Sequence, residues 1–225
     1  MINIASVSKK LISGLDQSDP VLAKPAGLRV GDLMIAIFFS YPYNGSYSAS
    51  GWTSVYTNMP NTSYYVGYAI LKKIATQADV DASTFSFTLS GDAIYNGGII
   101  YRIPEGDFNK VQISTNIAGT VTPQSSRNIV ILNDVTGDND SDYSTFSGYT
   151  LTGGVSPTFT EEYDDHEASY MRNSLGSAWG RYDSTSNITA FNITATNSGV
   201  DTEFKFMLVI GEVPQINNSN MFLMF

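Results

Sequence analysis

Three aspartates that alternate along one short segment could bind a calcium ion. Asp138, Asp140 and Asp142 have the i, i+2, i+4 spacing with which EF-hand calcium loops present their first hard oxygen ligands. The sixth position of such a loop is glycine and the twelfth is glutamate, whereas this chain has Tyr143 and Tyr149 there. The pattern therefore favours a solvated acidic loop, with a Ca²⁺ site as the alternative, and no other cofactor is indicated.

The sequence offers little for nucleophilic or hydrolytic catalysis. It has no cysteine, and its single histidine, His166, stands beside Asp164, Asp165 and Glu167. These carboxylates favour the charged form of the histidine, and without a Gly-x-Ser-x-Gly elbow a solvated loop is predicted there. The cluster over residues 161–165 is interpreted as a solvated loop or a patch facing a basic partner. A glycosidase would need two carboxyls facing across a groove, and the sequence alone shows no such pair. We predict that the protein is not an enzyme.

Tyrosines and serines between residues 40 and 50 form a different kind of segment. Tyr41, Tyr43 and Tyr47 alternate with small residues, a composition also used by adaptable recognition surfaces. Together with Trp52, these rings could stack on a sugar face or on another protein. The alternative, which the sequence favours, is a loop packed against the edge of its own sheet.

An apolar segment closes the sequence, behind a polar stretch. Its residues are Met221, Phe222, Leu223, Met224 and Phe225. An exposed apolar end would promote aggregation, so we predict that residues 214–225 form an arm buried against a neighbouring subunit or a shell protein. Folding back onto the chain's own domain is the alternative.

The elements that must position these residues are predicted to be strands almost throughout. Residues 32–39 form a nearly continuous apolar run, and residues 84–89 alternate, with Phe85, Phe87 and Leu89 on one face. One helical turn is expected at residues 76–82. The predicted fold is all-β, an antiparallel two-sheet sandwich of jelly-roll type.

The order of segments in the first half returns in the second, after a polar linker over residues 109–126. The matched pairs are 127–132 with the strand starting at Asp32, 149–154 with 51–56, 190–199 with 84–91, and 203–214 with 98–104. We interpret this as a duplicated five-strand unit; chance similarity is the alternative. Halves of about 1–105 and 127–213 would share one core in a single domain, 1–213, because each alone would expose a sheet face.

Composition and charge exclude several classes of protein. The 225 residues are 42% hydrophobic and contain no cysteine, which argues against disorder and against a disulfide scaffold. A net charge of −9 with only 12 Lys and Arg argues against nucleic acid as a partner. Nine acids and no Lys or Arg lie between Asn128 and Met171, and the other 12 acids cancel the 12 Lys and Arg. An acidic pole on loops of the second half is therefore predicted.

No secretion or membrane signal is recognised in the sequence. The N-terminus lacks a basic region followed by an apolar run, and no segment approaches the roughly 18 apolar residues of a membrane helix. We expect synthesis in a cytoplasm without a signal peptide, and no membrane insertion.

Five segments of the first half together resemble a known module. They are Gly31-Asp-Leu-Met-Ile-Ala-Ile37, Gly51-Trp-Thr53, residues 68–76, Phe85-Ser-Phe-Thr-Leu-Ser-Gly91 and Gly98-Ile-Ile-Tyr-Arg102. In this order they resemble a β-sandwich module of tail-fibre, head-fibre and other virion surface proteins of tailed bacteriophages. The resemblance covers roughly residues 1–213, most clearly 25–105, and includes no catalytic motif.

The resemblance implies a structural protein of a virion, although a fold alone does not fix function. We expect a non-enzymatic capsid decoration or small tail component, displayed on the particle and made in the host cytoplasm. Other virion proteins and further copies of the chain would be its partners. A tail-fibre or adhesin module that binds host-surface glycan is the alternative.

Overall fold

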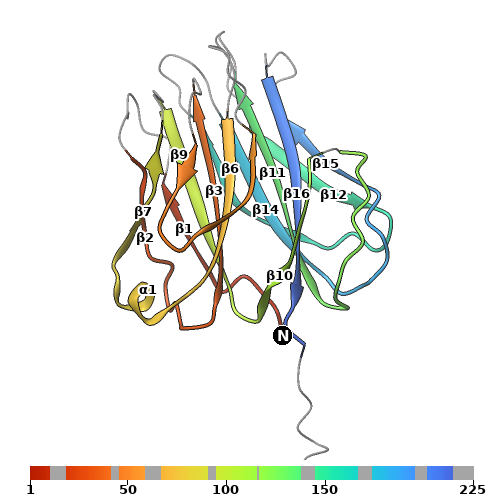
Figure 1. Ribbon diagram of the computed structural model, residues 1–225. Coiled ribbons are helices and arrows are strands. Elements are labelled where there is room, and N and C mark those ends of the chain that lie inside the picture. The colour runs from red at the N-terminus through yellow and green to blue at the C-terminus, as the bar shows by residue number, and fades with distance from the viewer. Residues whose placement is uncertain are drawn as a thin grey trace, which may run out of the picture.

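The computed structural model describes residues 1–10, 19–41, 46–58, 67–90, 95–115, 117–137, 145–166, 174–195 and 202–214. In these ranges the fold is all-β, as predicted, with antiparallel sheets and one short helix, α1 (Gln77–Asp81) (Figure 1). No helix in the described ranges is long and apolar enough to span a membrane.

The strands fall into two sets along the chain. The first set is β1 (Ser6–Lys10), β2 (Val21–Ala23), β3 (Leu33–Tyr41), β4 (Tyr47–Ser48), β5 (Thr53–Asn58), β6 (Gly67–Ile74), β7 (Thr84–Ser86), β8 (Thr88–Leu89) and β9 (Tyr95–Ile103). The second set is β10 (Gly106–Ser114), β11 (Asn128–Gly137), β12 (Phe146–Thr152), β13 (Phe159–His166), β14 (Ser174–Tyr182), β15 (Ala190–Ala195) and β16 (Thr202–Glu212).

Each set forms one five-stranded sheet, and the two sheets have the same internal order. The first sheet reads β1-β9-β3-β6-β5 and the second reads β10-β16-β11-β14-β13. Three two-stranded sheets, β2-β7, β4-β8 and β12-β15, accompany them. The chain thus forms more than the two sheets predicted, because each half folds short strands over the outer face of its own large sheet.

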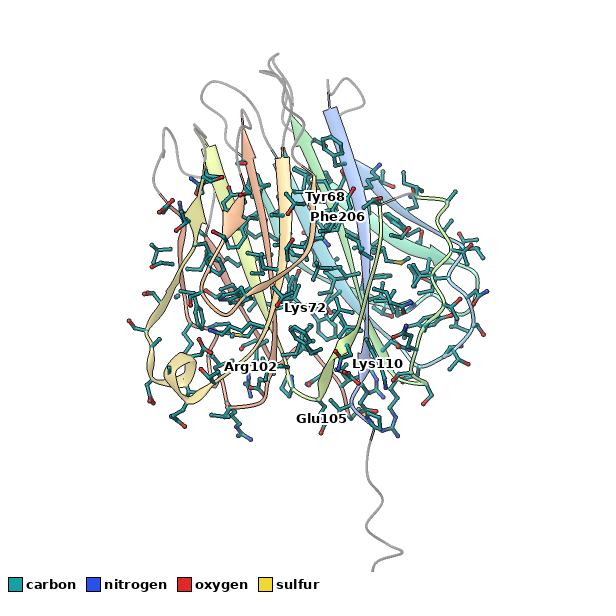
Figure 2. The ribbon with its side chains drawn as sticks, in the orientation of Figure 1. Tyr68, Lys72, Arg102, Glu105, Lys110 and Phe206 are labelled. Atoms are coloured by element: carbon teal, nitrogen blue, oxygen red, sulfur yellow. The ribbon has the colours of Figure 1, made fainter. Side chains whose placement is uncertain are left out.

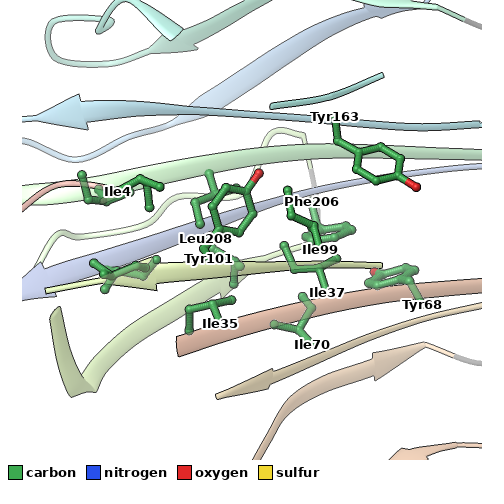
Figure 3. Packing of buried hydrophobic residues seen from close by; sticks show 14 of the residues in the cluster. Ile4, Ile35, Ile37, Tyr68, Ile70, Ile99, Tyr101, Tyr163, Phe206 and Leu208 are labelled. Carbon is green, nitrogen blue, oxygen red and sulfur yellow. The ribbon is translucent and has the colours of Figure 1, made fainter. Parts of the chain in front are cut away.

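Side chains that alternate along the central strands enter different hydrophobic clusters. Ile35 and Ile37 of β3 lie in the cluster shared by the two large sheets, together with residues of β9, β11 and β16 (Figure 3). Met34, Ala36 and Phe38 lie in a second cluster, with Leu22 and Phe85 of the small sheets and Phe87, which lies between β7 and β8. A third cluster occupies the corresponding place between the second sheet and β12-β15. Strand β3 is therefore buried on both faces, as its apolar run predicts.

The motif segments of the first half meet one another in the folded chain. Asp32 accepts hydrogen bonds from Arg102 Nε, at 2.6 Å, and from the Arg29 backbone N–H, at 2.8 Å. The Trp52 ring lies 5.1 Å from the ring of Phe87 and 5.9 Å from that of Phe85. These residues therefore stabilise the fold of the first half by direct contact.

Three local predictions were wrong. The linker expected from residue 109 includes most of β10, whose alternation is obscured by a register shift between Gly106 and Val111. The cluster at residues 161–165, with His166 after it at the end of the strand, lies in β13, not in a loop. Residues 149–154 were matched with 51–56, the segment that begins β5. They include instead the end of β12, which pairs with β15, and β13 occupies the edge position that corresponds to β5. Gly51 and Gly153, both with positive φ, precede the edge strands β5 and β13.

The predicted helical turn is α1, capped by reciprocal hydrogen bonds between Thr76 and Asp79. The Asp79 carboxylate also accepts a bond from Lys73 Nζ at 2.6 Å. Burial alone would raise the pKa of Asp79, but the hydrogen bonds from Lys73 and Thr76 outweigh it, so the pKa is lowered.

Replacing Asp79 with asparagine is expected to lower the free energy of unfolding by about 1–2 kcal/mol at pH 7. Because the folded pKa lies below the unfolded value, near 4, the carboxylate stabilises the fold above about pH 4 and loses this effect as the pH falls through the folded pKa. Urea unfolding of both proteins at pH 7 and pH 3 measures the difference. A difference of equal size at both pH values would contradict this assignment.

Candidate assembly site at the end of the last strand

The described strand ends define two poles of the molecule (Figure 1). We call one end of the body the loop pole: it holds the ends of β3, β11 and β13. These ends pair with the starts of β9, β16 and β14. We call the opposite end the attachment pole, because the chain leaves the last strand there. At this pole β16 ends at Glu212, which pairs with Gly106 at the start of β10. Pro214, the last described residue, follows directly, so residues 215–225 are joined to the body at this pole.

A polar pocket lies at the attachment pole. It has a volume of about 300 Å³ and is lined by Lys110, Ser125, Ser126, Arg127, Glu212, Val213 and Pro214. Strands β10 and β16 and the segment that enters β11 bring these residues together, although 102 positions separate Lys110 from Glu212. Figure 2 shows Lys110 and Glu105 near this end of the body.

One wall of the pocket holds the end of β16 in place. The Glu212 carbonyl accepts hydrogen bonds from Lys110 Nζ at 3.0 Å and from Ser125 Oγ at 3.1 Å. The Glu212 backbone N–H donates to the Arg127 carbonyl at 3.0 Å, and the Val213 N–H donates to Glu105 O at 2.8 Å. Every one of these bonds involves the last two residues before Pro214, so the exit of the chain has a defined position.

The Glu212 side chain joins the start of the chain to the same wall. Its carboxylate is largely buried and accepts a hydrogen bond from the Ile2 backbone N–H at 3.0 Å, and Arg127 Nη1 lies 3.5 Å from its other oxygen. The Met1 amino group contacts both Glu212 and Glu105, and its hydrogen bond lowers the pKa of the Glu105 carboxyl. Residues 1–4 thus belong to the body, with Ile2 and Ile4 in the shared core.

The tyrosine-rich segment is only partly described, and what is described is packed. The ring of Tyr47 is 3% exposed, stacks on Phe38 at 4.9 Å and donates its hydroxyl to Phe39 O. Trp52 is partly buried against Phe85 and Phe87. Tyr41 ends β3, and its side chain and the whole of Tyr43 lie outside the description. Tyr47 is therefore a core residue, whereas Trp52 packs against the core and stays partly exposed.

Two other predicted sites fall outside the described residues. They are the aspartate triad Asp138, Asp140 and Asp142, and the apolar arm Met221, Phe222, Leu223, Met224 and Phe225. Within the described ranges, no group of three or more His, Cys, Asp or Glu residues could hold a metal ion.

Acidic residues of the second half lie along the edge strand β13. Glu162 accepts a hydrogen bond from Trp179 Nε1 at 3.1 Å and lies 3.7 Å from Lys9 Nζ of the first half. Burial, followed by the nearby Asp164 carboxylate, raises the pKa of Glu161. Charged residues on an edge strand oppose pairing with another chain. This edge is therefore poorly suited to strand addition.

Sequence reasoning did not identify the residues of the attachment pole. Lys110, Ser125 and Arg127 fell in or beside a predicted linker, and Glu212 fell in an apolar strand. No local sequence signal could have found them, because the pocket joins residues from three distant segments of the chain.

Comparisons with known proteins found no match: no family model fits the sequence, and neither a curated protein nor a solved structure is similar to it at a significant level. The resemblance to phage virion modules therefore stays a prediction that rests on the motif segments.

Proposed function

We propose that the protein is a non-enzymatic structural component of a bacteriophage virion, displayed on the particle surface as a capsid decoration or a small tail component. The observation that carries this proposal is the polarity of the body. Strand β16, inside the second sheet, ends at the attachment pole, to which the apolar arm is joined. The acidic segment 138–142 is joined to β11 at the opposite pole.

The strand order supports a finer description of the fold, a jelly-roll sandwich in each half. In the first half, the order β1-β9-β3-β6 faces a layer in which β2 pairs with β7 and β4 with β8. In the second half, β10-β16-β11-β14 faces β12-β15, and a bridge between Val121 and Ile188 takes the place of β2-β7. Jelly rolls of two packed sheets are common in capsid proteins. Two such units joined through their large sheets would make one rigid module.

The position of β16 suits a strand that carries the attachment. It pairs with β11 from Thr202 to Gly211 and with β10 on its other side. Force on residues 215–225 would therefore act along two hydrogen-bonded ladders at once instead of peeling an edge strand. Other virion proteins, and further copies of this chain, are the partners that this geometry suits.

Packing of the aromatic rings favours this function over the glycan-binding alternative. Stacking on a sugar would require an open ring face, which the buried Tyr47 lacks because it packs on Phe38, and one side of the partly buried Trp52 is occupied by Phe85 and Phe87.

Deleting Met221–Phe225 is expected to reduce incorporation into particles by about tenfold or more, since each buried large apolar side chain contributes about 1.5–3 kcal/mol. The deletion leaves the described body intact, so its thermal unfolding should not change. Incorporation is measured by quantitative immunoblotting of purified particles.

The matched control is Asn217→Ser with Asn218→Ser, which alters the same arm without removing apolar surface. Incorporation of the deletion variant at the wild-type level would overturn the proposal.

A further inference from the structure

We propose that the pocket at the attachment pole is a binding site for an oxyanion, a carboxylate or phosphate group. A volume of about 300 Å³ is many times the roughly 10–15 Å³ that one water molecule needs. A small anion therefore fits together with several waters. The inference concerns the isolated folded chain and does not depend on display on a virion.

Arg127 and Ser126 are the lining residues with donors left over, because Lys110 Nζ already donates to Glu212 O and to Ser125 Oγ. Arg127 carries five N–H donors, and its side chain, 46% exposed, makes only the 3.5 Å contact with Glu212 among the residues described. Ser126 is exposed, and its hydroxyl bonds to no other described residue. The Glu212 carbonyl already accepts from Lys110 and Ser125. An occupant that supplies acceptors is therefore the one that the walls can satisfy.

The charges of the lining favour an anion over a cation. Lys110 and Arg127 are cationic, and Glu212 is the single carboxylate of the lining. That carboxylate is engaged by the Ile2 N–H and by Arg127. Asp107 lies 3.6 Å from Lys110 Nζ and offsets part of its charge, and Glu105 is also close to the pole. The expected affinity is accordingly modest, because partly exposed charge pairs contribute little.

Arg127 presents a planar fork that matches carboxylate and phosphate geometry. Its backbone is fixed by the bond from the Glu212 N–H to the Arg127 carbonyl. Lys110 is also fixed, because its stem packs beside Gly211, where an added Cβ would lie 2.9 Å from Lys110 Cδ. The Lys110 ammonium therefore has a defined position before an anion binds, and the Arg127 side chain extends from a fixed backbone.

The test is titration of the purified full-length protein with sodium phosphate and with sodium acetate, at constant ionic strength set with chloride, followed by backbone amide chemical shifts. We expect saturable shifts around Ser125–Arg127 and Glu212. Arg127→Gln should weaken binding about tenfold, the loss of one charge-assisted contact of about 1.4 kcal/mol. Arg181→Gln, which removes another arginine outside the pocket lining, should leave binding within about twofold of the wild type.

The two anions distinguish the sources of the ligand group. Tighter binding of phosphate assigns the pocket to a phosphorylated ligand, and equal or tighter binding of acetate assigns it to an acidic side chain or a chain terminus. Absence of saturable shifts with both anions, or equal weakening by Arg127→Gln and Arg181→Gln, would overturn the inference. Unfolding midpoints of both variants show that each is folded during the titration.

Discussion

Replacing Phe206 with alanine is expected to lower the free energy of unfolding by about 3–5 kcal/mol. Phe206 of the second sheet is fully buried and stacks on Tyr68 of the first sheet, with ring centroids 4.6 Å apart and planes 6° apart (Figures 2 and 3). Its removal leaves a cavity between the two large sheets. Val155→Ala, at a side chain that is 80% exposed, is the control and should change the stability by less than about 0.5 kcal/mol.

The same variant tests whether the two halves unfold together. The chain has two tryptophans, Trp52 in the first half and Trp179 in the second, so Trp52→Phe and Trp179→Phe each leave one fluorescent reporter. Because the halves share a core, both reporters should show one coincident urea transition, and Phe206→Ala should shift both midpoints equally. Two separate transitions, with only the Trp179 half affected, would contradict a shared core.

Replacing Arg102 with methionine is expected to cost about 3–5 kcal/mol, because it leaves the Asp32 carboxylate buried without its cation. The two side chains are 11% and 9% exposed and are joined at 2.6 Å. Arg102 also donates to Ala26 O at 3.2 Å, so the pair holds the turn before β3 against β9. Urea unfolding at pH 7 measures the loss.

A double-mutant cycle supplies the control. Replacing both partners, Arg102→Met with Asp32→Leu, removes the orphaned charge and should cost clearly less than the sum of the two single losses. Additive losses would show that the pair does not act as a unit. Lys24→Met, at another cation on the same side of the first half, should cost less than Arg102→Met, since it leaves no buried carboxylate.

Much of the fold could be predicted from strand patterns where burial is strong and regular. The apolar run at residues 32–39 predicted a strand buried on both faces. The structure explains the run, since the two faces of this strand enter two different clusters. The alternation of Phe85 and Phe87 with exposed Thr84 and Ser86 was also confirmed. The sequence predicted no link between the Gly-Asp and Tyr-Arg motifs, and in the folded chain they meet as the Asp32–Arg102 pair.

Other parts were beyond local patterns. The register shifts in β10 and β13 interrupt the two-residue period on which strand prediction depends, and acidic residues on β13 made an edge strand look like a loop. In the second half, Asn128 stands at the start of the central strand, as Asp32 does in the first. It donates to the carbonyls of Ser125, Tyr182 and Ser184 instead of forming an ion pair. This difference hides the repeat at the level of residue types.

The attachment pole could not be predicted because it is built from distant parts of the chain. Glu212, Lys110 and Arg127 become neighbours only when β16 enters the middle of the second sheet. No spacing in the sequence records that contact. The pocket therefore follows from the topology, and the proposed anion binding follows from the donors that the topology collects.

The orientation of the protein on the particle tests the proposed function most directly. An electron cryomicroscopy reconstruction of particles that carry the protein would show which pole faces the particle. We expect density for the end of β16, with Glu105, Lys110 and Glu212, against the shell or tail, and the ends of β3, β11 and β13 pointing outward. The reverse orientation, or particles without density for this protein, would contradict attachment through this pole.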